Sequence, residues 1–496
     1  MTAAVQGTPG LAALQQRLGV IAPHLLADPG PVEGDDPAAT CEDLFLRLVE
    51  SVTEVPTCDR IWLLLVGLTA TFPTDDEVRA ARRQLEIESV DGAAFWLLDQ
   101  AYDAAVSNGS GAHRLRIVSG VVVDVDYTAT HDLLTGIQRV VRTVVPRWHR
   151  DHDVELAVWT ERASAFREPV PDERERVLHW RGPLRRPTLP PAEPVVVVPW
   201  RGTVVVPEVP RIAQCRRLTS LAAHSRNRVV LVGYDCIPVV SAELVPIAEP
   251  IRFVQYLALV KHAEVVAAIS ESAAREFRGF VDALPSQGLT GPEVSACPLA
   301  FELPDAAADG GGGAASLREP EVVVVGSHDP RKNHLSVLHA SEVLWREGLR
   351  FRLRMLGSGG WTTGAFDRQV AELRRAGRAL TVEREMDDQH VWAAYRRARF
   401  TVFTSFHEGF GLPVAESLAA GTPVIAGSHG AVAETASGGG AVLVDPVDDK
   451  ALVDAMRRLL TDDGALEDLR RAARARRTRT WDDYAAELWA IATGSR

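Results

Sequence analysis

The spacing of apolar residues divides the chain into a helical start and a long α/β remainder. Residues 1–110 carry apolar side chains at helical intervals, as at 44–50 and 90–102, without strand-like runs bounded by turns. We therefore expect a helical N-terminal extension there, and no motif in it indicates a role. The Ser-Asn-Gly-Ser-Gly-Ala stretch at 107–112 predicts a flexible exit from this extension.

Beyond that point, short β-branched runs alternate with helical stretches. Continuous valine-rich strands that are separated by helices predict parallel sheets buried on both faces. The first series of expected strands lies at 116–125, 154–159, 194–199, 228–234 and 265–270. The second series lies at 321–326, 351–357, 379–383, 400–405, 423–427 and 441–445.

A glycine-rich segment separates the two series of strands. Its four consecutive glycines, within 305–316, suit neither a helix nor a strand and predict an interdomain linker. A chain of 496 residues also exceeds the roughly 250–300 residues that one hydrophobic core supports. We predict an α/β protein with two Rossmann-like, doubly wound domains, at 113–304 and 318–480, that face each other across a cleft. Ligands of such sheets bind beyond the carboxyl ends of the strands, so the chemistry is expected in the loops that follow strands.

Charge and cysteine content narrow the range of functions. The chain has 54 basic and 66 acidic residues, and its net charge of -12 argues against a nucleic-acid partner. Five scattered cysteines without a C-x-x-C pair resemble neither a disulfide framework nor a zinc site and fit a reducing cytoplasm. We find no signal-peptide pattern, and the longest apolar run, at 61–70, is half the ~20 residues needed to span a bilayer. A cytoplasmic location is therefore expected.

A cluster of arginines near the end of the chain has two interpretations. Such a cluster forms a solvated helix face or contacts a lipid surface or an anionic acceptor, so peripheral membrane contact stays open. The oligomeric state is not indicated by any pattern. The cluster comprises Arg470, Arg471, Arg474, Arg476, Arg477 and Arg479.

The segment from residue 400 to 427 combines a strand, a glycine-bearing loop, a helix and a second strand. Pro413 suits the first helical turn, and Gly421 suits the left-handed residue that ends a helix. Gly409 and Gly411 let the backbone approach a ligand without a Cβ atom, while the helix start presents free N–H groups. This combination predicts a binding seat for a diphosphate.

Two acids, Glu408 and Glu416, flank this seat eight positions apart. Carboxylates repel phosphate but accept hydrogen bonds from hydroxyl groups, so the pair indicates contacts with sugar and ribose hydroxyls. For Glu416 there is an alternative, in which it only complements the positive end of the helix dipole.

The Glu-x7-Glu arrangement in Glu-Gly-Phe-Gly-Leu-Pro-Val-Ala-Glu-Ser-Leu-Ala-Ala-Gly-Thr-Pro-Val-Ile, from 408 to 425, resembles the signature of the retaining glycosyltransferase family 4, which has the GT-B fold. The resemblance implies that Glu408 lies near the donor sugar and that Glu416 holds the ribose of the nucleotide. It also implies that the sugar and the diphosphate are served by the backbone amides of Gly409, Phe410, Gly411 and Leu412.

A second segment, Val-Val-Val-Val-Gly-Ser-His-Asp-Pro-Arg-Lys-Asn-His at 322–334, delivers Arg331 and Lys332 just past the end of a buried strand. Cations there can neutralise a leaving diphosphate, so no metal is required. The family's G-x-x-x-P-R-K-N form places the phosphate contact on the lysine, which Lys332 matches. Many relatives have another arginine directly after the glycine, where this chain has Ser327, so it stays open whether Arg331 replaces it. A solvated surface pair is the alternative.

In the first domain, Thr135 is a candidate cap of a helix that follows a strand, and Gly136 is the residue of close approach. The Thr-Gly-Ile-Gln-Arg-Val sequence resembles the family's first glycine loop, whose backbone faces donor phosphate and sugar across the cleft. The resemblance therefore implies donor binding at Gly136.

Asp235, in Leu-Val-Gly-Tyr-Asp-Cys-Ile-Pro-Val at 231–239, follows a strand and precedes a proline turn. The segment resembles the family's His-Asp-x-Ile-Pro motif but carries Tyr234 where the histidine is common. Asp235, Tyr234 or neither contacts the reacting sugar or the acceptor, and a turn-capping role for Asp235 is the alternative. Ser270 is expected to be a helix cap. No role is assigned to four loop histidines without metal-ligand spacing, His131, His328, His407 and His429.

The resemblance covers roughly residues 115–490 and implies a metal-independent, retaining glycosyltransferase. Such an enzyme moves a sugar from a nucleotide-diphosphate sugar to a hydroxyl acceptor, which could be a polysaccharide, a lipid-linked glycan or a secondary metabolite. No cofactor besides this co-substrate is expected. The terminal helix, at 481–496, would cross back to the first domain. A nucleotide-sugar epimerase and a non-catalytic GT-B binding or scaffold protein are the two alternatives.

Overall fold

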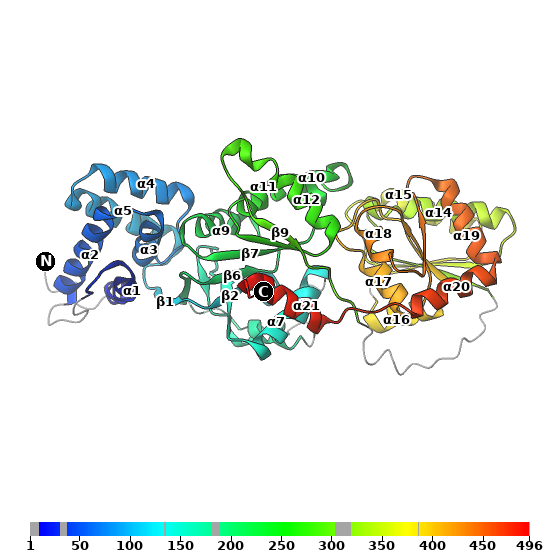
Figure 1. Ribbon diagram of the computed structural model, residues 1–496, viewed down its shortest axis with the longest axis horizontal. Helices are drawn as coiled ribbons and strands as arrows, with labels where there is room; N and C mark the ends of the chain where they lie inside the picture. Colours follow the sequence, from blue (N-terminus) through cyan, green and yellow to red (C-terminus); the bar gives the residue numbers. More distant parts are fainter. Residues whose placement is uncertain are drawn as a thin grey trace.

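The computed structural model describes residues 9–29, 37–132, 135–180, 193–302, 319–384 and 386–495, together with residues 182, 188, 189 and 191. The glycine-rich segment at 305–316, for which we predict a linker, lies outside these residues. The described parts form a row in which a helical unit is followed by two α/β domains (Figure 1). Within the described ranges, no helix has the length and apolar content needed to cross a membrane.

The N-terminal unit is helical, as the periodicity of its apolar residues predicts. Its helices α3 and α4 begin directly after Thr57 and Thr74, and the Thr74 hydroxyl accepts a hydrogen bond from the backbone N–H of Glu77. The described helices of this unit are α1 (Pro9–Leu25), α2 (Pro37–Glu54), α3 (Cys58–Thr69), α4 (Asp75–Ile87) and α5 (Val90–Asn108).

The prediction of a flexible exit at 107–112 is wrong. Gly109 caps α5 with φ 66°, and the buried Ser110 hydroxyl donates to the carbonyl oxygen of Thr69 at 2.6 Å. The buried Arg17 guanidinium donates to the carbonyl oxygens of Gly111 and of residues 67, 68 and 113. Polar and glycine residues form a packed turn here, because side-chain groups of the helical unit satisfy the backbone of the turn.

The first α/β domain is built on a nine-stranded sheet in the order β1-β5-β4-β3-β2-β6-β7-β8-β9, parallel except at β4. Its strands are β1 (Arg114–Val118), β2 (Val121–Asp124), β3 (Val154–Trp159), β4 (Phe166–Arg167), β5 (Val195–Pro199), β6 (Thr203–Val206), β7 (Arg228–Gly233), β8 (Val265–Ala268) and β9 (Glu293–Ala296). The helices between them are α6 (Asp126–Thr130), α7 (Gly136–Asp151), α8 (Pro171–Leu178), α9 (Ile212–His224), α10 (Ile237–Val240), α11 (Ala248–Val260) and α12 (Glu271–Val281), with short 3-10 turns η1 (Ala242–Leu244) and η2 (Leu284–Gln287).

The single strand predicted at 116–125 is two strands. β1 pairs with β5, whereas β2 pairs with β3 and β6, so the chain changes its place in the sheet at Gly120. Gly202 lies against this crossing, and a Cβ atom there would come within 2.4 Å of the Gly120 carbonyl oxygen. The crossing therefore requires glycine at position 202. The sequence did not predict the strand β6, which begins directly after Gly202.

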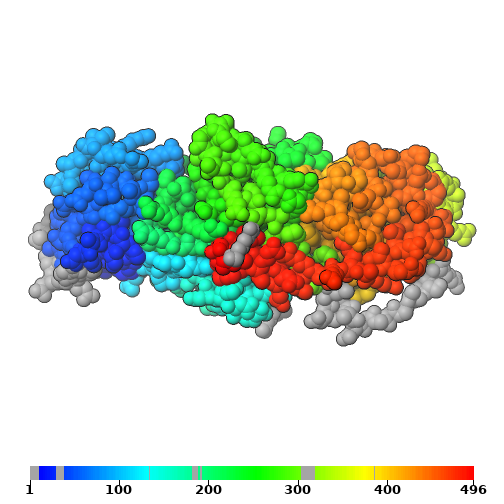
Figure 2. All heavy atoms as spheres, in the orientation of Figure 1, coloured from blue at the N-terminus to red at the C-terminus, as the bar shows by residue number. Residues whose placement is uncertain are grey.

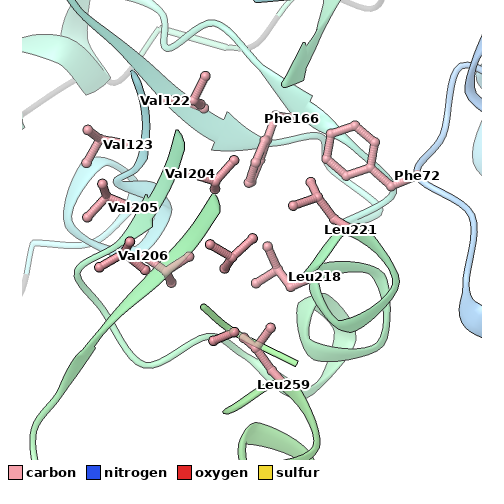
Figure 3. Packing of buried hydrophobic residues seen from close by; sticks show 14 of the residues in the cluster. Phe72, Val122, Val123, Phe166, Val204, Val205, Val206, Leu218, Leu221 and Leu259 are labelled. Carbon is pink, nitrogen blue, oxygen red and sulfur yellow. The ribbon is translucent and has the colours of Figure 1, made fainter. Parts of the chain in front are cut away.

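The helical unit and the first sheet share one hydrophobic core. Phe72, which follows α3, is fully buried and packs edge-on against Phe166 of β4, with ring centroids 5.2 Å apart. Figure 3 shows Phe72 beside Phe166 and Leu221, with the valines of β2 and β6 next to them. The N-terminal helices thus contribute to the core of the first domain.

The second α/β domain has a six-stranded parallel sheet in the order β12-β11-β10-β13-β14-β15. Its strands are β10 (Glu321–Val325), β11 (Arg352–Leu356), β12 (Leu380–Glu383), β13 (Phe400–Phe403), β14 (Val424–Gly427) and β15 (Ala441–Val444). Its helices are η3 (Pro330–Lys332), α14 (His334–Arg346), α15 (Gly364–Arg375), α16 (Asp388–Arg397), α17 (Leu412–Ala419), α18 (Gly430–Ala436), α19 (Asp449–Thr461) and α20 (Asp463–Arg474). Two helix-flanked parallel sheets after a helical start confirm the predicted fold class.

The last helix, α21 (Trp481–Thr493), lies on the first domain. Trp148 of α7 donates its indole N–H to the carbonyl oxygen of Ala485 at 2.9 Å, and His152 stacks on Trp489 with ring centroids 3.9 Å apart. Figure 2 shows this C-terminal segment in red, extending from the second domain onto the first. The chain therefore joins its two α/β domains a second time.

Candidate active site at the domain interface

The glycine-bearing loop between β13 and α17 has the local structure that its sequence predicts. Gly411 is the N-cap of α17 with φ 98°, and Pro413 occupies the first turn. Gly421 takes φ 74° just past the end of the helix. The preceding loop and the amino end of α17 therefore lie at the carboxyl edge of the sheet, where ligands of parallel sheets bind.

Glu408, in this loop, forms a largely buried cluster with the two predicted cations, and the three side chains are 11–13% exposed. Its carboxylate accepts from Lys332 Nζ at 2.6 Å and lies 2.7 Å from a guanidinium nitrogen of Arg331. Burial would raise the pKa of Glu408, but the charges and hydrogen bonds of Lys332 and Arg331 lower it to about 2. Glu408 is therefore an ionised acceptor at neutral pH, and Arg331 and Lys332 do not form a solvated surface pair.

The loop that carries the two cations packs closely against the loop that follows β11. Arg331 and Lys332 lie in η3, which follows β10, and Lys332 Nζ is 5.2 Å from the centroid of the Phe403 ring at the end of β13. A Cβ atom at Gly357, which follows β11, would meet the Gly326 carbonyl oxygen at 1.9 Å. Gly357 therefore permits the close packing of the two loops, whereas Gly326, the glycine of the Gly-x-x-x-Pro-Arg-Lys-Asn segment, has a positive φ of 151°, which favours glycine.

The loop of the second domain touches the first domain through Gly409. Its carbonyl oxygen accepts from the Ser270 hydroxyl at 2.7 Å, and a Cβ atom on Gly409 would lie 2.3 Å from the Tyr234 carbonyl oxygen. Gly136 is also at this interface, since a Cβ atom there would lie 3.6 Å from Leu412 Cδ1. The structure thus brings the predicted glycines of both domains to one interface.

Ser270 and Thr135 both have capping positions. Ser270 accepts from the backbone N–H of Ala273 and so caps α12, as predicted, in addition to its bond with Gly409. Thr135 is the N-cap residue of α7, and its backbone N–H donates to the Gln138 side chain. A single hydroxyl at Ser270 therefore serves both a helix start and the contact between domains.

Asp235 lies beside Gly409, and its carboxylate caps a turn. One carboxylate oxygen accepts from the backbone N–H of Ile237 at 3.1 Å, and the other would be 3.2 Å from a Cβ atom on Gly409. Burial raises the pKa of Asp235 to about 6, helped by Glu276 and opposed by Arg331 and other neighbours. The buried Tyr234 donates its hydroxyl to the Pro207 carbonyl oxygen at 2.8 Å, which directs that side chain into the first domain.

Glu416, in α17, contacts residues of both domains. Its carboxylate accepts from Arg139 of α7 at 2.7 Å and from the Tyr395 hydroxyl at 3.0 Å. Burial raises the pKa of Glu416, against the lowering effect of Arg139 and Tyr395. Arg139 also bonds to Asp388 at 3.1 Å. Glu416 therefore does more than complement a helix dipole, because it belongs to an ion pair that links the domains.

Sequence reasoning missed Arg139, which lies three residues after Gly136 in the same quoted motif. Its position in the first turn of α7 could have indicated a contact with the second domain, because a helix that begins at the domain interface directs its first residues toward the other domain. A second missed residue is Glu434, whose carboxylate accepts from the backbone N–H groups of Glu271 and Ser272 at the start of α12. No local pattern marks Glu434, since its partners lie in the other domain.

His407, for which no role was predicted, connects the domains next to Glu408. Its Nε2 lies 2.7 Å from Glu276 and its Nδ1 lies 2.8 Å from the Ser241 hydroxyl. Burial would lower the pKa of His407, but the hydrogen bond and charge of Glu276, with Asp235 and Glu408, raise it above the ordinary 6.5. The protonated ring is therefore the form that these contacts favour.

This contact predicts a pH dependence of stability. A group whose pKa is higher in the folded state stabilises fully below its unfolded value of 6.5, and the stabilisation is lost as pH rises through the raised pKa. As pH rises above 6.5, we expect the thermal midpoint of the parent protein to fall more steeply than that of the His407→Gln variant. A matched His429→Gln variant, which alters an exposed N-cap residue of α18, should behave as the parent protein does. Identical pH profiles for the parent and His407→Gln would contradict the assignment.

The described residues offer no group of three or more histidine, cysteine, aspartate or glutamate side chains arranged to hold a metal ion. The independence from metal stays a prediction, which rests on the cations Arg331 and Lys332. All the predicted site residues lie at or next to the interface between the two sheets, whereas their roles toward a ligand stay predictions.

The fold consists of two helix-flanked, mainly parallel sheets, and the predicted site residues lie where the two α/β domains meet. The family described as Glycosyl transferases group 1 matches residues 313–476, which contain the second α/β domain. The motifs from 322 to 334 and from 408 to 425, on which the resemblance rested, lie inside the match.

Two curated relatives from Escherichia coli carry mannosyltransferase names. The serotype-specific mannosyltransferase WbdA is 27% identical over 323 residues, which are 62% of this chain and 37% of that protein. The O-antigen chain mannosyltransferase B is 33% identical over 142 residues, which are 28% of this chain and 36% of that protein. The chain thus spans less than half the length of these relatives.

Solved structures show the fold. A sucrose-phosphate synthase from Thermosynechococcus elongatus has a TM-score of 0.52 at 17% identity, over 75% of this chain and 98% of that one. HepE of Anabaena, in complex with UDP-glucose, has a TM-score of 0.51 at 13% identity, over 75% of this chain and 99% of that one. At these identities the similarity concerns the arrangement of the two domains.

Proposed function

We propose that the protein is a retaining glycosyltransferase that moves a sugar from a nucleotide-diphosphate sugar to a hydroxyl acceptor without a metal ion. The observation that carries this proposal is the largely buried cluster of Glu408, Lys332 and Arg331 at the start of the glycine-bearing loop. Cations fixed in a buried site stabilise charge that develops on a leaving diphosphate, and their hydrogen bonds are already oriented before the reaction.

Each part of the interface has a role in this proposal. The amides of Gly409, Phe410, Gly411 and Leu412 bind the sugar and the diphosphate at the amino end of α17. Glu416 accepts from the ribose hydroxyls, which replace one of its present donors, Arg139 or Tyr395. Glu408, ionised at neutral pH, accepts a hydrogen bond from a hydroxyl group of the donor sugar.

The transfer itself requires no separate base on the protein. The acceptor hydroxyl enters on the face of the sugar from which the diphosphate leaves, and a phosphate oxygen takes the proton. Lys332 and Arg331 stabilise the charge on the departing diphosphate. Gly136 approaches the donor from the first domain, and Asp235, with a pKa of about 6, contacts the reacting sugar or the acceptor.

A donor screen tests the proposal. The protein is incubated with UDP-, GDP- and dTDP-sugars, with GDP-mannose first because relatives are named mannosyltransferases. We expect one of them to raise the thermal midpoint, since stabilisation grows with the logarithm of the ratio of ligand concentration to its dissociation constant. Release of free nucleoside diphosphate in the presence of EDTA, and an unchanged anomeric configuration by NMR, support retaining, metal-free transfer. Release of an isomeric nucleotide sugar instead would identify an epimerase, and absence of any binding would favour a non-catalytic role.

A further inference from the structure

Both oxygens of the Glu416 carboxylate, which is proposed to hold the ribose of the donor, already accept hydrogen bonds. Arg139 Nη1 lies 2.7 Å from one oxygen, and the Tyr395 hydroxyl lies 3.0 Å from the other. The Glu416 side chain is only 10% exposed. Little of this carboxylate is therefore open to a ribose hydroxyl while both donors are in place.

Arg139 is the donor that can leave. Tyr395 is buried and belongs to the same domain as Glu416, on the helix α16 that contacts α17. Arg139 belongs to the first domain, and its side chain is 31% exposed and has a second, exposed partner in Asp388. Releasing Arg139 requires the rotation of an accessible side chain, whereas releasing Tyr395 requires the repacking of a buried ring.

The guanidinium of Arg139 lies near the proposed binding seat of the diphosphate. Gly136 begins α7 and Leu412 begins α17, and a Cβ atom on Gly136 would lie 3.6 Å from Leu412 Cδ1. The amino ends of the two helices therefore meet. Arg139 follows Gly136 by three residues on the same face of α7, and helix side chains tilt toward the amino end of their helix. From this position the guanidinium can reach the amino end of α17.

The cations already present at the seat are matched by carboxylates. Lys332 and Arg331 both contact Glu408. Arg331 also lies 3.8 Å from Asp329 and donates to the His407 carbonyl oxygen at 2.7 Å. Two cations thus face two carboxylates, so this group alone does not balance the negative charges of a diphosphate. An arginine suits the additional role, because a guanidinium forms bidentate hydrogen bonds with carboxylates and phosphates alike.

We propose that Arg139 exchanges partners when the donor binds. Its guanidinium leaves Glu416 and binds the diphosphate, and the ribose hydroxyls take its place on the carboxylate. The inference rests on the proposed glycosyl transfer and adds to it a donor-binding residue from the first domain. A nucleoside without phosphates must break the same ion pair and offers the guanidinium no new anion. The exchange therefore selects nucleoside diphosphates over nucleosides.

The test is calorimetry on the full chain with UDP, GDP and dTDP, each compared with its own nucleoside. The contribution of the diphosphate is the ratio of the two dissociation constants. We expect Arg139→Gln to reduce this ratio at least about tenfold, which is the effect of losing one hydrogen bond to a charged group. Glutamine still offers an amide donor to Glu416, so the buried carboxylate keeps a partner and the fold should be retained.

Two further variants serve as controls. Arg139→Lys keeps the positive charge and should retain most of the ratio. Arg147→Gln is the matched control, because Arg147 lies in the same helix, is similarly exposed and pairs with Asp482 of α21 at 2.7 Å. Both affinities of this variant should equal those of the parent protein.

Three outcomes of Arg139→Gln would overturn the inference. Equal increases in the affinities for nucleoside and nucleoside diphosphate show that Arg139 only obstructs the ribose site. Equal decreases show that it only holds the domains together, and unchanged affinities show that it does not take part in binding. Turnover of a donor by the parent protein is measured alongside, so any of these outcomes with intact turnover leaves the proposed function standing. Absence of diphosphate binding and donor turnover in the parent protein refutes the proposed function itself.

Discussion

Replacing Lys332 with methionine is expected to lower the rate of sugar transfer by about 10²- to 10³-fold, which is the usual effect of removing one oriented electrostatic donor from a transition state. Methionine keeps much of the length and volume of the side chain beside the Phe403 ring but removes the charge. Lys332 Nζ is 2.6 Å from Glu408, so the lysine lies at the point where the proposed diphosphate charge develops. The measurement is kcat with saturating donor, together with the dissociation constant of the donor.

The fold should survive this substitution, because Glu408 keeps Arg331 at 2.7 Å as a partner for its buried carboxylate. An unchanged far-ultraviolet circular dichroism spectrum and thermal midpoint would verify this. Lys450→Met provides the matched control, since Lys450 is an exposed residue paired with Asp454 on α19. If Lys332→Met and Lys450→Met turn over the donor equally fast, the phosphate site lies elsewhere.

Features that depend on neighbouring residues could be predicted from the sequence. The loop conformation after β13 could be predicted because it depends on glycines and a proline, whose backbone preferences are local. Helix α17 begins and ends where Pro413 and Gly421 indicate. The same holds for the Ser270 cap and for the valine-rich strands of both sheets. The fold class followed from these elements, because their alternation alone implies parallel sheets.

Features that depend on distant partners could not be predicted. Arg139 and Glu416 are 277 residues apart, and His407 meets Glu276 at a separation of 131 residues. The place where β1 becomes β2 is also set by partners, since each strand pairs with a different part of the chain. The turn at 107–112 also depends on a distant residue, because the buried guanidinium of Arg17 bonds to the backbone of a segment whose composition predicts flexibility.

These distant contacts concentrate at the interface between the domains, which is where the chemistry is proposed to occur. Glu416 accepts a hydrogen bond from the first domain, Glu276 and Ser241 hold His407, and Ser270 binds the Gly409 carbonyl. Residues of the glycine-bearing loop thus contact the opposing domain, and the same loop is proposed to bind the substrate. We therefore expect a substitution that keeps the two domains apart to act like one that removes a catalytic group.

Gly409→Ala is expected to have such an effect, with a loss of at least about 10²-fold in kcat/KM. The new Cβ atom would lie 2.3 Å from the Tyr234 carbonyl oxygen and 3.2 Å from the Asp235 carboxylate, so the domains must separate. A misplacement of about 1 Å at a reacting site can cost that factor. Gly409 does not have a positive φ, so alanine fits its own backbone and each domain should keep its stability.

Small-angle scattering and steady-state kinetics on the same protein distinguish separation from unfolding. A larger radius of gyration with donor present, an unchanged thermal midpoint and the loss of activity together support the closed interface as the reactive state. Gly279→Ala is the control, because its exposed position in α12 has no atom within 4 Å of the added Cβ. Full activity in Gly409→Ala would mean that sugar transfer does not require the approach of this loop to the first domain.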